Sequence, residues 1–108
     1  MRVIVILLIC LCSVFTNAQN DVLFKEGNTL YNSGKYAEAI QKYETVLKTG
    51  EHSSALYFNL ANAHYKLNNV APSIYYYEKA LQLSPNDKDI KTSQWIFHII
   101  IMENILIL

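Results

Sequence analysis

Two consecutive stretches of 34 residues, 20–53 and 54–87, repeat the same residue types in register without any insertion or deletion. Gly27 aligns with Ala61, so a small residue recurs where two backbones would come close together. A fixed period of this length predicts a solenoid, in which each repeat is one supersecondary unit that buries its apolar face against its neighbours. The matched pairs are Phe24 and Phe58, Asn28 and Asn62, Tyr31 and Tyr65, Ala37 and Ala71, Ile40 and Ile74, Tyr43 and Tyr77, Glu44 and Glu78, and Leu47 and Leu81.

Each copy predicts a pair of helices. In the first copy, a helix opens at Asn20 and ends before Gly34, which suits a left-handed turn, and a second helix spans 35–49. In the second copy, Asn68 takes the turn position of Gly34, and Pro72 falls in the first turn of the following helix. The residues expected to face the core are Leu23, Gly27, Leu30, Tyr36, Ala39, Ile40, Tyr43, Val46, Leu47, Tyr57, Leu60, Ala61, His64, Leu67, Ile74, Tyr77, Ala80, Leu81 and Leu83.

This helix–turn–helix unit of 34 residues resembles the tetratricopeptide repeat. In the second copy, Leu60-Ala61 stands at the Leu-Gly of the family, Tyr77 at the aromatic of the second helix, and Pro85 at the terminal proline. The first copy departs from the pattern with Glu26 at the leucine and Glu51 at the proline. The resemblance implies an all-α fold, an α-solenoid of two repeats closed by a C-terminal helix, and a module that binds proteins and is not an enzyme.

A narrower resemblance concerns three runs of the chain, 57–67, 74–81 and 84–91. These runs are similar to the repeat region of bacterial BatE-type aerotolerance proteins. Those proteins are exported, with repeats at the front and a membrane-anchored rear. The resemblance therefore implies an accessory or scaffold of a membrane-associated complex, acting in the periplasm.

The first residues form a predicted targeting segment, 1–18. Arg2 supplies a positive start, 3–14 is an apolar run, and small residues at 16–18 precede an expected cut ahead of Gln19. The apolar run is too short to span a bilayer by itself. We expect an exported protein, periplasmic or membrane-associated, with a retained anchor as the alternative.

The C-terminal segment, 88–108, is expected to form the helix that caps the repeats. Gln94 and Trp95 stand where the repeat needs a large apolar residue and then a small one, and from Ile96 onward almost every position is apolar. Three interpretations remain open: a cap with exposed apolar surface, a contact with a partner or a membrane, and a tail altered by a frameshift or a premature stop. Under the third, the chain is a fragment of a longer repeat protein with little activity of its own.

The sequence contains no pattern typical of a catalytic, metal or cofactor site. The formal net charge is zero, which does not favour a nucleic-acid partner. Both cysteines, Cys10 and Cys12, lie in the targeting segment, so a cleaved chain would have no thiol for disulfides or catalysis. The histidines His52, His64 and His98 share no metal-binding spacing.

The first helix of each repeat is expected to line an inner groove. Asn28 and Asn62 would form an amide ladder able to bond an extended peptide backbone, and the paired phenylalanines and tyrosines would form aromatic ladders. Alternatively, these side chains only pack between neighbouring helices. Phe24 stands where carboxylate-binding members of the family have lysine, so that type of clamp is not expected. The predicted groove residues are Phe24, Asn28, Tyr31, Phe58, Asn62, Tyr65 and Lys66, with Asp21, Asn32 and Ala55 beside them.

Overall fold

The computed structural model describes residues 1–107, apart from the side chains of residues 16 and 107, and this part of the chain folds entirely into α-helices and short connections. The predicted all-α class is therefore confirmed for these residues. Leu108, the last residue of the predicted capping segment, and the Thr16 side chain of the expected cleavage motif lie outside the described part. The helices are α1 (Arg2–Asn32), α2 (Tyr36–Lys48), α3 (Ser54–Lys66), α4 (Val70–Leu83) and α5 (Lys88–Ile107).

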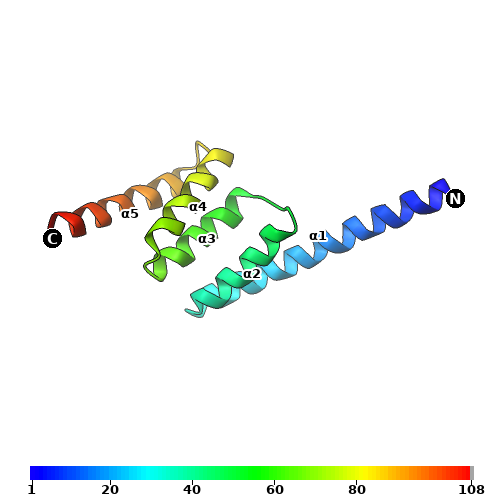
Figure 1. Ribbon diagram of the computed structural model, residues 1–108, viewed down its shortest axis with the longest axis horizontal. Helices are drawn as coiled ribbons and strands as arrows, with labels where there is room; N and C mark the ends of the chain where they lie inside the picture. Colours follow the sequence, from blue (N-terminus) through cyan, green and yellow to red (C-terminus); the bar gives the residue numbers. More distant parts are fainter. Residues whose placement is uncertain (108) are drawn as a thin grey trace.

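The helices pack as two stacked hairpins followed by a closing helix (Figure 1). α1 pairs with α2, α3 pairs with α4, and α2 and α3 join the two hairpins. α5 packs on α4. Its start matches the first helix of a third repeat, because Ile90 is buried one 34-residue period after Leu56, which is buried at the start of α3. Its cap repeats as well, because the Ser53 Oγ accepts from the Leu56 N–H at 3.1 Å and the Asp87 Oδ1 from the Ile90 N–H at 3.2 Å.

The two turns inside the hairpins have the predicted conformation. Gly34 has φ 78° and Asn68 has φ 59°, both in the left-handed region that ends the preceding helix. Asparagine tolerates this region better than most residues with a Cβ, so the same turn survives in the second copy without glycine.

Two of the expected core positions are wrong. Leu67 and Leu83 are exposed, because Leu67 is the cap after the end of α3 and Leu83 is the last residue of α4, so no further helical turn covers them. Leu56 and Ala63 are buried instead, in the cluster that joins the two hairpins. Glu26, which departs from the repeat pattern, lies near the surface with its carboxylate 3.0 Å from the Lys42 ammonium.

α1 differs from the expectation at its start, since it begins at Arg2 and runs without a break past Asn20. No glycine or proline occurs before Gly27, so nothing in the sequence interrupts the helix. Asn20 is buried and does not cap α1; its amide donates to the Thr49 hydroxyl and to the Glu51 carboxylate, both at 2.8 Å. By length and composition, α1 is apolar enough to cross a membrane, a criterion that N-terminal signal sequences also meet. Cleavage ahead of Gln19 stays a prediction.

The close approach of α1 and α2 is made at Gly27. A Cβ built on this residue would lie 2.6 Å from Cε1 and 2.9 Å from Cδ1 of Tyr43. The ring is buried and hydrogen-bonded, so it has little freedom to move away.

Overpacking at Gly27→Ala should cost about 1–3 kcal/mol. Alanine favours a helix by about 1 kcal/mol over glycine, so we expect the free energy of unfolding to fall by a net amount of up to about 2 kcal/mol. Urea unfolding of the whole chain in mild detergent, followed by circular dichroism, measures the change. In a Tyr43→Leu background the same substitution should cost less, and an equal cost in both backgrounds would show that the ring is not the cause.

Candidate functional site

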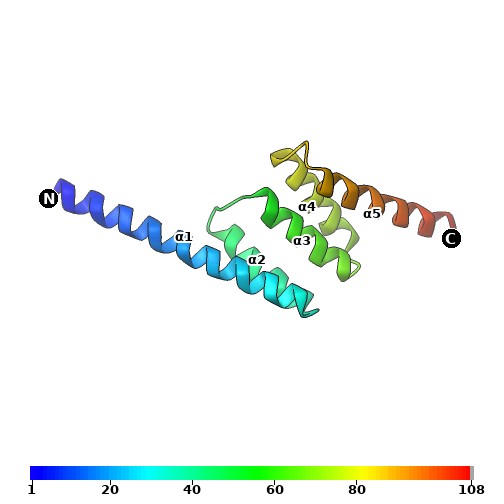
Figure 2. The ribbon, with the colours of Figure 1, turned by 180° about the vertical axis from the view of Figure 1, so that it is seen from behind.

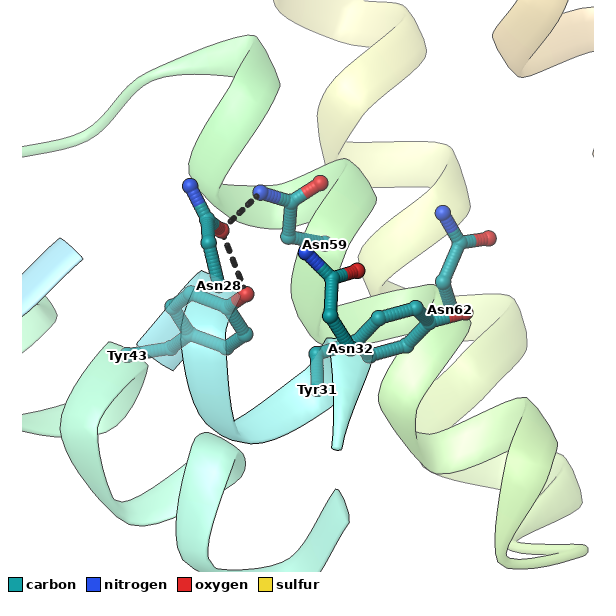
Figure 3. A pocket seen from close by; sticks show the side chains of 6 residues that line it. All are labelled: Asn28, Tyr31, Asn32, Tyr43, Asn59 and Asn62. Atoms are coloured by element: carbon teal, nitrogen blue, oxygen red, sulfur yellow. Dashed lines mark hydrogen bonds between the residues drawn. The ribbon is translucent and has the colours of Figure 1, made fainter. Parts of the chain in front are cut away.

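A polar pocket of about 340 Å³ opens between the first helices of the two repeats (Figure 3). Its lining is neutral, with four asparagine amides and two tyrosines. Two adjoining hairpins supply these residues, so the pocket exists only because the hairpins stack. The lining residues are Asn28, Tyr31 and Asn32 from α1, Tyr43 from α2, and Asn59 and Asn62 from α3.

The asparagines of the two repeats are held in the same way. The Tyr43 hydroxyl donates to the Asn28 Oδ1 at 2.6 Å, and the Tyr77 hydroxyl donates to the Asn62 Oδ1 at 2.6 Å. The Asn59 amide adds a bond of 3.0 Å to the Asn28 Oδ1, across the junction between the repeats. The Asn–Tyr spacing of 15 residues therefore recurs because it places an amide of the first helix against a hydroxyl of the second.

These bonds engage the Oδ1 atom of Asn28 and of Asn62, and the Nδ2 atom of each side chain is left for a ligand. Within the described residues, the Nδ2 atoms of Asn28 and Asn62 donate no hydrogen bond, and Figure 3 shows both pointing the same way. The Asn59 Oδ1 and the Asn32 amide also make no bond to other described side chains. The pocket thus offers both donors and acceptors at its surface, and no charge.

The predicted aromatic ladders do not form ring contacts between repeats. Phe24 packs on Tyr43 with ring centroids 5.8 Å apart, and Phe58 packs on Tyr77 at 6.1 Å, each inside its own repeat. Phe24 lines a separate hollow near Asn20, and neither phenylalanine lines the polar pocket of the four asparagines. Both rings turn toward the tyrosine of their own hairpin, because that ring lies within reach across the close helix pair.

A second pocket of about 250 Å³ continues along the same side and shares Tyr31 and Asn62 with the first. The structure therefore brings together Asn28, Tyr31, Asn62, Tyr65 and Lys66 of the predicted groove, and leaves Phe24 and Phe58 outside the two pockets. We call the two pockets together the amide groove. The lining of the second pocket is Tyr31, Asn62, Tyr65, Lys66, Tyr77, Ser93 and Ile96.

Asn59 is a lining residue that the repeat comparison missed. It aligns with Lys25 in the first copy, so no matching pair marks it. Asn59 precedes Asn62 by three residues, which places both on one face of a helix. This spacing could have predicted Asn59 as a groove residue. Ser93 and Ile96 were missed because only the packing of α5 on α4 brings them to the groove.

The anchoring tyrosines stay protonated at any physiological pH. Burial, the largest cause, raises the pKa of Tyr43 to about 12 and that of Tyr77 to about 12. Both hydroxyls therefore remain donors to their asparagines. Among the groove residues that the structure describes, Lys66 is the charged one.

His64 is a packed histidine of the core. Burial lowers its pKa, its ring stacks on Tyr76 at 5.6 Å, and its Nδ1 lies 3.1 Å from the Asn69 amide nitrogen. A neutral ring accepts this amide hydrogen, whereas a protonated ring would oppose it. In the part of the chain that the structure describes, no three side chains of His, Cys, Asp or Glu gather to hold a metal ion.

Comparison with known proteins agrees with this architecture. A family model described as tetratricopeptide repeat matches residues 24–88, which span the last part of α1 and all of α2, α3 and α4 and include every lining residue of the first pocket. Among the curated proteins, none matches the chain at a significant level.

Proposed function

Because the chain belongs to the tetratricopeptide repeat family, it is a protein–protein interaction module, and we propose that it binds an extended peptide segment in the amide groove. The observation that carries the proposal is the pair of locked asparagines. Tyr43 and Tyr77 hold Asn28 and Asn62 by their oxygens, so the two Nδ2 atoms are presented to a ligand in a preset orientation. Preset donors lose little entropy when a ligand binds.

The chemistry of the groove favours a peptide backbone over a charged group. Backbone carbonyls accept from the Nδ2 atoms of Asn28 and Asn62, and backbone N–H groups donate to the Asn59 Oδ1. The tyrosine rings of Tyr31 and Tyr65 provide apolar area beside these amides. Lys66 at one end of the groove adds a preference for an acidic residue at the corresponding end of the segment.

The test converts both amides to carboxylates. In Asn28→Asp with Asn62→Asp, an oxygen still accepts from each tyrosine hydroxyl, but the outward N–H donors are replaced by acceptors. Losing two hydrogen bonds of about 0.5–1.5 kcal/mol each, with added repulsion of backbone carbonyls, predicts roughly tenfold to hundredfold weaker binding. The probe is a peptide selected by phage display on the wild-type chain, and fluorescence anisotropy measures its Kd.

A matched control carries the same chemical change outside the groove. Asn86→Asp with Asn104→Asp alters two exposed asparagines and adds the same charge. We expect the Kd of this control to equal that of the wild type. If the groove variant is folded by circular dichroism and binds the peptide as tightly as the control, the amide groove is not the binding site.

We further propose that the module is exported and serves as an accessory or scaffold of a membrane-associated complex of the aerotolerance type. This is supported by the apolar first half of α1 and by the resemblance, read from the sequence, of 57–67, 74–81 and 84–91 to the repeats of such proteins. Cell fractionation, together with the intact mass of the purified chain, tests the first step. A chain in the cytoplasm that retains residues 1–18 would contradict export.

A further inference from the structure

The outer face of α5 carries an unpartnered apolar stripe. Trp95, Ile99, Met102 and Leu106 are between 48% and 81% exposed, whereas Ile90 and Phe97 on the opposite face are buried against α4. The four exposed residues are spaced by four, three and four positions, which is the alternation of a coiled-coil seam. We call them the α5 seam.

A further repeat hairpin cannot cover this seam in the way that α2 covers α1. The close approach inside each hairpin uses a small residue, Gly27 in the first and Ala61 in the second, and a Cβ on Gly27 already meets Tyr43 at 2.6 Å. The equivalent position in α5 is Trp95. An indole at this point holds a neighbouring helix farther away, so another mode of packing is required.

We propose that the α5 seam pairs with the α5 seam of a second copy of this chain, as a parallel two-helix coiled coil. Ile99 and Leu106 occupy one core position of the heptad and Trp95 and Met102 the other, and β-branched Ile99 at its position favours a two-stranded assembly. Phe97 and Asn104 lie at the outermost heptad position, so the face packed on α4 points away from the partner.

The polar side chains beside the α5 seam also fit the parallel arrangement. In a parallel coiled coil, the two positions of each heptad that lie beside the core residues face the partner helix. A residue at one of these positions meets the residue five places later on the partner helix. This rule places His98 of each copy beside Glu103 of the other, and both side chains are exposed in the single chain. The twofold symmetry makes the contact twice.

The direction of the helices supports the same arrangement. Figures 1 and 2 show that α1 and α5 run in the same direction, with the apolar half of α1 at one end of the 69 Å-long molecule and the end of α5 at the other. A twofold axis along α5 therefore places the apolar N-terminal halves of both copies at the same end. Both would enter one bilayer if these segments are retained, whereas an antiparallel pair would place them at opposite ends.

The size of the surface also fits a dimer better than a lipid contact. Trp95, Ile99, Met102, Ile105 and Leu106 are each about half exposed or more, and on the order of 100 Å² or more from each gives a surface at the small end of specific interfaces, roughly 600 Å² per partner. From Thr92 to Ile107, α5 has no lysine or arginine, although helices that lie on membranes carry them on the polar face.

Disulfide trapping of the whole chain in detergent micelles tests the pairing and its direction. In a Cys10→Ser, Cys12→Ser background, Met102→Cys would face its own copy across a parallel seam, and we expect an oxidised dimer. Asn104→Cys, one half-turn away, is the matched control and should stay uncrosslinked. No dimer with Met102→Cys, or equal crosslinking of both variants, would overturn the proposal.

Charge exchange tests the partner without a cysteine. His98→Glu puts two acidic side chains together and should weaken the dimer by a few-fold to tenfold in sedimentation, and adding Glu103→Lys should restore it.

Ile99→Asp places a charge in the seam and should abolish the dimer. The substitution leaves the packing of α5 on α4 intact, because that packing uses Phe97 on the opposite face of the helix. A chain that stays monomeric, while Trp95 fluorescence shifts on anionic vesicles, would show lipid as the occupant. A dimer that survives Ile99→Asp would place the interface elsewhere.

Discussion

Replacing Tyr77 by alanine is expected to lower the free energy of unfolding by about 3–5 kcal/mol, the usual cost of deleting a large buried ring. The ring is 2% exposed and packs on Phe58 at 6.1 Å and on Phe97 at 6.3 Å, so it joins α3, α4 and α5. Its hydroxyl also donates to Asn62 in the amide groove. In a domain of this size such a loss takes away much of the total stability.

The run Tyr75-Tyr76-Tyr77 supplies the control for this experiment. Tyr75 is 53% exposed, with its ring beside the Tyr76 ring and the Lys79 ammonium, so Tyr75→Ala should cost less than about 1 kcal/mol. Tyr77→Phe keeps the ring and loses one hydrogen bond, which predicts about 1 kcal/mol. Urea unfolding curves give the three values, and a cost for Tyr75→Ala equal to that for Tyr77→Ala would contradict the assigned core.

Stability is expected to fall steeply at alkaline pH. Burial raises the pKa of Tyr43 to about 12 and that of Tyr77 to about 12, while tyrosine in an unfolded chain ionises near 10. Between these values the unfolded chain has released protons that the folded chain still holds. The contribution of each buried tyrosine to the free energy of unfolding is therefore complete below about pH 10. It is lost as the pH rises toward 12, by about 1.4 kcal/mol per pH unit for each tyrosine.

The double variant Tyr43→Phe with Tyr77→Phe isolates this effect. It should be less stable than the wild type near neutral pH, because Asn28 and Asn62 each lose the hydrogen bond from a tyrosine hydroxyl. Its free energy of unfolding should then decline less between about pH 10 and 12, so that the two curves converge. Urea unfolding at several pH values measures both curves. Parallel curves would show that these two hydroxyls do not titrate as their burial requires.

The amide groove could be predicted only in part. Asn28, Tyr31, Asn62, Tyr65 and Lys66 were found because they lie at fixed positions of a repeat. The contacts of the Phe24 and Phe58 rings were not found, because a ring beside a helix can turn toward either neighbour and only packing decides which. Asn59 lacked an equivalent in the other copy, and its role depends on a bond across the repeat junction.

The sequence by itself determined the local architecture of this protein: the period, the helix pairs, the left-handed turns at Gly34 and Asn68, and the need for a small residue at Gly27 where two backbones come close. These features depend on residues within one repeat, where spacing along the chain already sets the distance in space. Only the tertiary structure decided that Asn20 is buried against Thr49 and Glu51, that two hairpins share the amide groove, and that Trp95 faces outward on α5. Those features depend on how separate units dock, and the free energy of docking comes from contacts between residues distant in sequence.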